Sequence, residues 1–116
     1  MERETPEKDR IVEHLLAELA LMIRSGTIDI DGPEGAMVDP QFLANNLDDW
    51  RNMLMLHRDE GVTVRQVAAL SALDAYLLVL SDADDPPLWE CEALQSRPEW
   101  DDVRTLAALA IDAFRA

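Results

Sequence analysis

Four helix-capping signals, each followed by apolar residues at three- and four-residue spacing, constrain the fold of this chain most strongly. The capping residues are Thr5, Asp39, Thr63 and Ser96. Proline follows the first two directly, and Gln or Glu stands three residues after the other two, as in a capping box. The side chains of capping residues accept hydrogen bonds from free N–H groups of the first helical turn, and proline at the first position has no N–H. The four signals therefore predict four helix starts.

The first signal predicts a helix over about residues 6–25. Its apolar stripe comprises Val12, Leu15, Leu16, Leu19, Met22 and Ile23, and Gly26 supplies the stop. Residues 27–30 then alternate in period two, and residues 31–35 are rich in turn formers. A small hairpin or an ordered loop is therefore expected over 27–38.

The second helix is expected to open at Asp39 and to close at Gly61. Its stripe comprises Leu43, Leu47, Trp50, Leu54 and His57. Residues 53–56 are apolar on every side of the helix. This half of the helix is therefore expected either to lie centrally in a bundle or to be covered by another chain.

The third helix follows Thr63, with Val67, Leu70, Leu73, Leu77 and Leu80 near one face. The pattern breaks over 82–87, where Asp85 is expected to cap a short helix over 88–94. Ser96 then opens a closing helix, whose predicted buried stripe comprises Val103, Leu106, Ala107, Ala110 and Phe114. The sequence thus predicts a single all-α domain over 1–116, a small helical bundle of four long helices plus one short helix.

The charge balance disfavours several classes of partner. The chain has 24 acidic and 10 basic residues, a formal charge of −14, which opposes direct binding of nucleic acid or of an anionic membrane. Its uninterrupted apolar runs fall short of the ~20 residues of a membrane span, and no signal peptide is visible. One cysteine, Cys91, permits no internal disulfide, as in reducing compartments. We therefore expect a cytoplasmic protein.

No residue pattern predicts an enzyme, a cofactor site or a metal site. His14 and His57 are the two imidazoles, and neither has the spacing of a metal-ligand motif. Cys91 lies between Glu90 and Glu92, whose charges oppose formation of a thiolate. The acidic stretches 29–32 and 82–85 lack the rest of a calcium loop.

The acidic segment 82–102 is the predicted partner-binding region. It holds eight carboxylates against one arginine, with Trp89 and Trp100 among them. Acidic surfaces accelerate encounter with a basic partner, and buried indoles supply affinity. The predicted contact residues are Asp82, Asp84, Asp85, Trp89, Glu90, Glu92, Asp101 and Asp102, with Asp48 and Asp49 as additions.

The function predicted from these features is binding of a protein with a basic surface, which the chain blocks or regulates. Bacterial immunity proteins, antitoxins and nucleic-acid mimics are physical analogies for this mode. A homodimer is also compatible with the apolar surplus of residues 53–56 and 75–80. In a competing interpretation the carboxylates serve solubility alone.

Two further alternatives remain open at this stage. A carboxylate-based enzyme or metal-binding bundle would need at least three side chains facing one cavity, drawn from Glu13, His14, Glu18, Asp48, Asp49, His57 and Asp74. A helix-turn-helix DNA-binding subunit would use the segment after Thr63. That segment offers few side chains able to contact base edges or phosphates.

Overall fold

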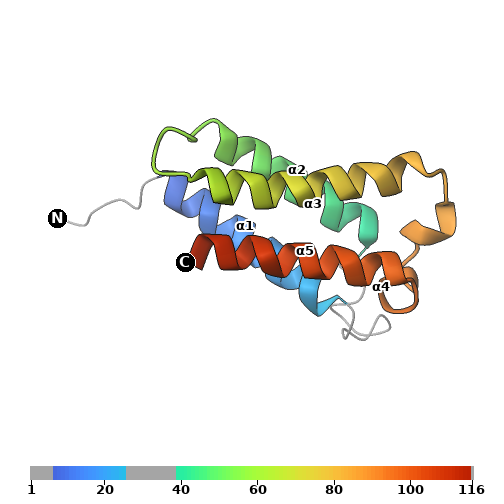
Figure 1. Cartoon of the computed structure of the whole chain (residues 1–116). Coiled ribbons are helices and arrows are strands. Elements are labelled where there is room, and N and C mark those ends of the chain that lie inside the picture. The colour runs from blue at the N-terminus through green and yellow to red at the C-terminus, as the bar shows by residue number, and fades with distance from the viewer. Residues whose placement is uncertain (1–6, 26–38, 116) are drawn as a thin grey trace.

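Four long helices and two short ones form the part of the chain that the computed structural model describes, residues 7–25 and 39–115 (Figure 1). The elements are α1 (Glu7–Arg24), α2 (Pro40–Met55), α3 (Val64–Asp82), the 3₁₀ helix η2 (Pro86–Trp89), α4 (Ala93–Ser96) and α5 (Pro98–Arg115). The predicted all-α bundle is confirmed. The predicted cap at Thr5 and the hairpin or ordered loop at 27–38 lie outside the described residues.

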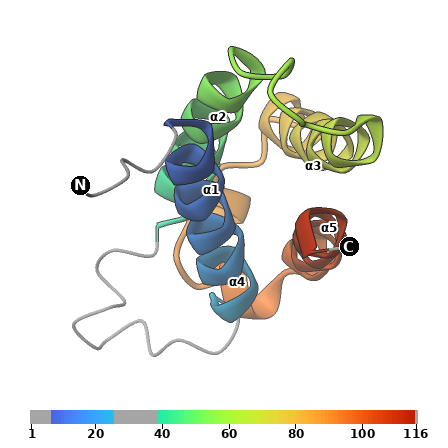
Figure 2. The same cartoon turned by 90° about the vertical axis from the view of Figure 1, so that its left-hand side faces the viewer.

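The long helices pack as a bundle that is closed on three sides. Consecutive long helices run in opposite directions (Figure 1). α1 packs against α2 and α5, and α5 also packs against α3. α2 and α3 contact each other less than these pairs do, and their ribbons lie apart (Figure 2). We call the space between these two helices the seam. The described chain measures 48 × 30 × 22 Å along its principal axes.

The core is formed by one apolar face from each long helix, as the stripes predict. Leu15 and Leu19 of α1, Leu73 of α3 and Ala107 of α5 have no exposed surface. Trp100, at the start of α5, is also fully buried and is the largest side chain in the core. Burying these side chains supplies most of the driving force for folding.

The predicted end of α2 at Gly61 is wrong, because the helix stops at Met55. Residues 56–61 form turns closed by short-range bonds, in which the His57 N–H donates to the Leu54 carbonyl at 2.8 Å. Such bonds tighten the last turn and end a helix early. Leu56 is consequently 84% exposed. Within the apolar stretch 53–56, Leu54 is fully buried, whereas Met53 is 39% exposed. The bundle therefore covers one side of this stretch, and cover of the rest by another chain stays a prediction.

The capping box that opens α3 is confirmed. The Gln66 N–H donates to Thr63 Oγ1 at 3.1 Å, and the Thr63 N–H donates to Gln66 Oε1 at 2.9 Å. From Val64 to Asp82 the helix is uninterrupted. No helix–turn–helix is formed within this stretch.

The short helix predicted over 88–94 is replaced by η2 and α4, with a break between them. Side chains of α5 explain the break, because each captures a backbone carbonyl. Trp100 Nε1–H donates to the Leu88 carbonyl at 2.8 Å, and Arg104 donates to the Leu94 carbonyl at 2.7 Å. These two bonds hold η2 and α4 separately against α5.

Two predicted caps in this region are also wrong. The Asp85 side chain makes no capping bond to η2 and instead accepts from Arg97. The Ser96 hydroxyl donates back to the Glu92 carbonyl at 2.9 Å, and α5 begins two residues later at Pro98. The backbone of Arg97 therefore occupies the position before the first turn of α5, where Ser96 was expected.

Candidate functional site

Trp89 occupies the end of the open seam between α2 and α3. It is half-buried, and its ring meets Trp100 edge to face, with ring centroids 5.5 Å apart and an interplanar angle of 88°. Trp100 is itself fixed by burial and by its bond to Leu88. The Trp89 ring therefore packs against a ring that is itself held in place, and this contact fixes the position of Trp89.

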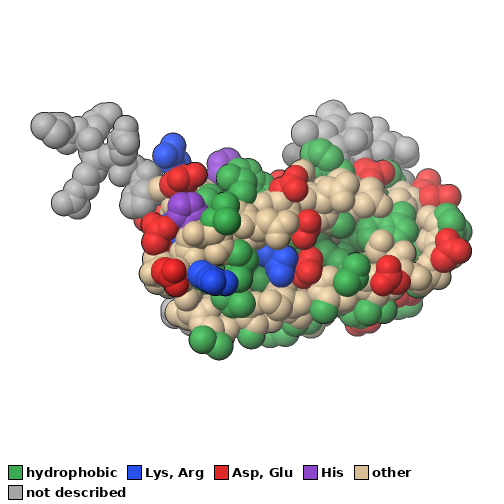
Figure 3. Space-filling model, turned by 90° about the horizontal axis from the view of Figure 1, so that it is seen from above, with side chains coloured by type: hydrophobic (Ala, Val, Ile, Leu, Met, Phe, Trp, Pro, Cys, Tyr) green, Lys and Arg blue, Asp and Glu red, His purple; other side chains and the backbone are tan. Residues whose placement is uncertain are grey.

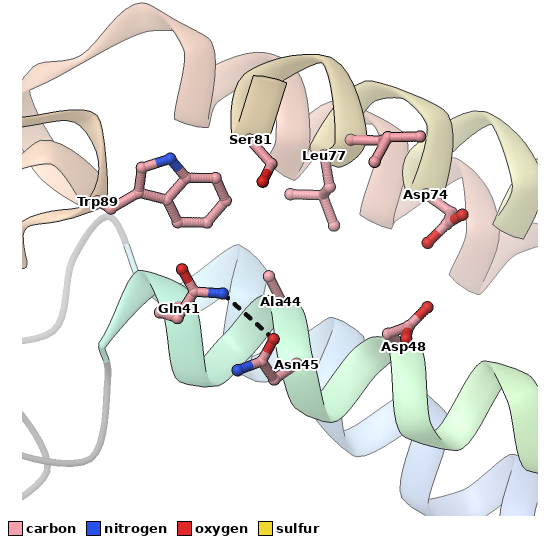
Figure 4. A pocket seen from close by; sticks show the side chains of 9 residues that line it. Gln41, Ala44, Asn45, Asp48, Asp74, Leu77, Ser81 and Trp89 are labelled. Atoms are coloured by element: carbon pink, nitrogen blue, oxygen red, sulfur yellow. Dashed lines mark hydrogen bonds between the residues drawn. The ribbon is translucent and has the colours of Figure 1, made fainter. Parts of the chain in front are cut away.

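A groove of about 240 Å³ lies between α2 and α3, with Trp89 as its end wall (Figure 4). Its lining residues are Gln41, Ala44, Asn45, Asp48, Asp74, Leu77, Leu78, Ser81 and Trp89. This volume is below the ~300 Å³ at which small-molecule sites begin. The groove suits a few side chains of a partner better than a free ligand.

The groove ends at Trp89 on one side and at two carboxylates on the other, with Leu77 between them (Figure 4). Asp48 of α2 and Asp74 of α3 face each other across it (Figure 4). Arg51 lies 3.9 Å from the Asp48 carboxylate and 3.8 Å from the Asp74 carboxylate. At these long distances the guanidinium offsets part of the negative charge and ties α2 to α3 weakly.

The floor near Trp89 is polar on the α2 side. The Gln41 amide donates to Asn45 Oδ1 at 3.2 Å (Figure 4). Each of these amides has further donor and acceptor capacity, so both can bind a partner's backbone.

Of the eight predicted contact residues, Asp85 is held within the fold. Arg97 lies between Asp85 and Glu99, at 2.6 and 2.7 Å from their carboxylate oxygens. The hydrogen bond from Arg97 lowers the pKa of Asp85 more than burial raises it, and the two carboxylates raise the pKa of Arg97. These three side chains link the segment after α3 to the start of α5. The Asp85 carboxylate therefore takes part in holding the fold together.

Asp101 and Asp102 are also engaged with neighbouring side chains. Asp101 pairs with Arg104, one turn later on α5. Asp102 accepts a hydrogen bond from the Tyr76 hydroxyl of α3 at 3.1 Å. Burial raises the pKa of Tyr76, and the bond to Asp102 raises it further. The Asp102 bond therefore joins α5 to α3, whereas the Asp101 pair lies within α5 and leaves that carboxylate largely exposed.

Four of the predicted carboxylates are exposed and form no ion pair with any residue that the structure describes. They are Asp82, Asp84, Glu90 and Glu92. Asp84 has a positive φ of 51°, a conformation that Asp tolerates better than most residues. Acidic side chains surround this end of the bundle, with hydrophobic side chains between them (Figure 3). We name these four residues the free acidic set.

Cys91 is half-buried between Glu90 and Glu92. Burial raises the pKa of its thiol most, and the charges of Asp39 and Glu92 raise it further. The sequence predicted that neighbouring acidic charges oppose formation of the Cys91 thiolate, and the raised pKa agrees with this. Asp39 contributes a charge that the sequence did not indicate. Burial and these charges both disfavour the thiolate, which is the nucleophilic form of the side chain.

The titratable side chains on α1 and α2 do not converge on a cavity. His14 stacks on Trp50 with ring centroids 4.4 Å apart, and His57 contacts Glu60 and lies 3.8 Å from Glu7. Within residues 7–25 and 39–115, no three His, Cys, Asp or Glu side chains are arranged to hold a metal ion. Of the seven residues named for a carboxylate site, Asp48 and Asp74 line the groove.

Glu18 is the one buried titratable group left short of a partner in the described structure. One of its carboxylate oxygens is buried without a hydrogen bond. Burial raises its pKa, whereas the hydrogen bond with Asn46 and the charge of His14 act in the opposite direction. The residue lies between α1 and α2, away from the groove lining, so it adds nothing to the candidate site.

Sequence reasoning missed the amide and apolar lining of the groove. Gln41, Asn45 and Ser81 are ordinary surface residues by type and spacing. Leu78 carried a weak signal, because it is a large apolar residue off the main stripe of α3. The groove depends on how far apart α2 and α3 lie, which no local pattern encodes.

No protein-family model matches this sequence, and no curated protein or solved structure matches it significantly.

Proposed function

We propose that this protein binds a second protein through the α2–α3 groove and the free acidic set, and blocks or regulates that partner. The observation that supports this most is the placement of Trp89, which is half-buried, lines the end of the groove and packs against Trp100. Aromatic side chains in such positions are typical anchors of protein interfaces.

The groove favours an amphipathic helix as the bound element. Its apolar lining, formed by Trp89, Leu77 and Leu78, accepts an apolar side chain. Gln41 lies near Trp89, and Asp48 follows it by about two turns of α2 (Figure 4). The acidic end, with Asp48 and Asp74, accepts a basic side chain. An apolar and a basic residue about seven positions apart on one helix face would reach both ends.

The free acidic set supplies long-range attraction to a basic partner. Asp82, Asp84, Glu90 and Glu92 are not neutralised by ion pairs within the described structure. Clustered like charges can raise the rate of encounter with an oppositely charged surface by 10 to 10³ at low salt. Covering a basic surface would prevent the partner from binding its own acidic ligand, and we place this activity in the cytoplasm.

The test uses a synthetic helix of about 18 residues that carries leucine and lysine about seven positions apart on the same face. Its affinity is measured by calorimetry and its association rate by stopped-flow fluorescence, each at low and at physiological salt. We expect Trp89→Ala to weaken binding by roughly tenfold or more. Changing Asp82 and Asp84 together to lysine should slow association and flatten its dependence on salt.

Matched controls separate these effects from net charge. Changing Glu13 and Asp112, two exposed carboxylates on α1 and α5, to lysine alters the charge equally and should leave the salt dependence near that of the native protein. A peptide with glutamate in place of lysine should not bind. The proposal is refuted if the native protein binds both peptides with equal affinity. It is also refuted if Trp89→Ala binds the lysine peptide as tightly as the native protein does.

A further inference from the structure

The outer face of α3 is unusually apolar for a surface. Val64 is 86% exposed, Leu78 59% and Val79 63%. Among the described helices, α3 has the length and apolar composition of a membrane span, yet only 22% of that stretch is buried in the bundle. Its inner face packs on α5. A helix that is apolar on both faces is usually covered on both.

The exposed apolar positions form one continuous stripe. Val64, Ala68, Ala72, Ala75 and Val79 are all exposed and follow one another at spacings of four, four, three and four residues. This is the pattern of a helix that packs along its length against another helix. The three alanines at its centre allow a close approach of the two backbones.

The charges on α3 are arranged with opposite signs at the two ends of this stripe. Arg65 lies at the N-terminal end and Asp82 at the C-terminal end, and both are exposed. Neither forms an ion pair with another described residue. The third charged residue of the helix, Asp74, lies on the groove side near Arg51. The stripe between the two ends is therefore uncharged.

We propose that this stripe is the interface between two copies of the chain, with the two α3 helices packed antiparallel. An antiparallel alignment that places Arg65 opposite Asp82 of the second copy also places Ala72 opposite Ala75 of that copy. Because the contact is two-fold symmetric, the ion pair forms twice. A parallel alignment would instead place like charges together at both ends.

A second copy fits this face better than another partner because the face is self-complementary. Two chains of charge −14 repel each other, so they approach most readily where the surface is uncharged and its end charges are complementary. The contact is about 28 Å long, from 1.5 Å per residue, and one helix wide. This is at the small end of the range for protein interfaces, so a dissociation constant on the order of micromolar is expected. The inference does not rest on the groove, although it shares Asp82 with the free acidic set. The other three residues of that set, Asp84, Glu90 and Glu92, lie outside α3.

Sedimentation equilibrium of the full chain, from low to high micromolar concentration, tests the proposal. The native protein should show a monomer–dimer equilibrium. Arg65→Glu and Asp82→Arg should each weaken the dimer by about tenfold, because two attractions become two repulsions. Combining the two substitutions should restore it. Ala75→Glu, which brings two carboxylates together near the symmetry axis, should leave a monomer.

Matched controls make the same changes elsewhere. Arg10→Glu on α1 and Ala108→Glu on α5 are at exposed positions and should dimerise like the native protein, and far-ultraviolet circular dichroism confirms that each variant is folded. A native protein that stays monomeric throughout overturns the proposal. So does a double variant no better than either single one. Flotation of the native monomer with phosphatidylcholine vesicles, lost in Ala75→Glu, would assign the face to a membrane instead.

Discussion

Replacing Trp100 with phenylalanine should destabilise the bundle and release the end wall of the groove. Trp100 is fully buried, and its Nε1–H donates to the Leu88 carbonyl at 2.8 Å. Phenylalanine fills most of the ring volume but has no donor. The substitution therefore removes the bond that holds η2 on α5 and loosens the contact behind Trp89.

The expected loss of stability follows from two contributions. Leaving the buried Leu88 carbonyl without its donor costs about 1–3 kcal/mol. The smaller ring adds a cavity cost of about 1 kcal/mol, below the ~3–5 kcal/mol of replacing a buried tryptophan with alanine. Together they give about 2–4 kcal/mol, or a melting temperature lower by roughly 8–15 °C for a domain of this size.

Urea unfolding followed by far-ultraviolet circular dichroism measures this loss. Trp89→Phe is the matched control, because Trp89 is half-buried and its indole nitrogen makes no hydrogen bond to a described residue. The control should cost less than about 1 kcal/mol. If both substitutions cost the same, the bond to Leu88 has no special role and the account of how Trp89 is held fails.

Three further predictions test the fold around the site. Thr63→Ala should cost about 1 kcal/mol by removing the cap of α3, seen as faster amide exchange at Gln66 and Val67; unchanged exchange would contradict the role of the capping box. Arg97→Met should lower the free energy of unfolding at neutral pH. Because the pKa of Asp85 is depressed in the fold, the difference from the native protein in urea titrations should shrink as the pH falls below about 3.9. A difference independent of pH would refute this prediction. Asp102→Asn should lower the raised pKa of Tyr76 without restoring its ordinary value, since burial remains; this is read from ultraviolet absorbance of the single tyrosine, and an unchanged titration would exclude the bond in solution.

Local patterns in the sequence were sufficient for the long helices and for the faces they bury. Four residues of the predicted α3 stripe, Leu70, Leu73, Leu77 and Leu80, are buried, and the fifth, Val67, is half-buried. Thr63 and Gln66 form the predicted box. These features depend on residues within a few positions of one another, so spacing alone reveals them.

The segment 83–97 shows where local patterns fail. Asp85 and Ser96 have the residue types of helix caps. Instead, Asp85 accepts a hydrogen bond from Arg97, and the Ser96 hydroxyl donates to the Glu92 carbonyl. Trp100 and Arg104 reach back over ten or more positions to the carbonyls of Leu88 and Leu94. Competition from distant side chains decides such a segment, and a window of neighbouring residues does not contain them.

The candidate site divides in the same way. The sequence by itself determined an acidic segment, a tryptophan in its midst and an apolar third helix. Tertiary structure decided that Asp85 and Asp102 bind side chains distant in the sequence, whereas Asp82, Asp84, Glu90 and Glu92 form no ion pair with a described residue. It also placed α2 and α3 far enough apart to leave a groove. The physical reason is that charge and hydrophobicity belong to residues, but availability for binding depends on which neighbours the fold supplies.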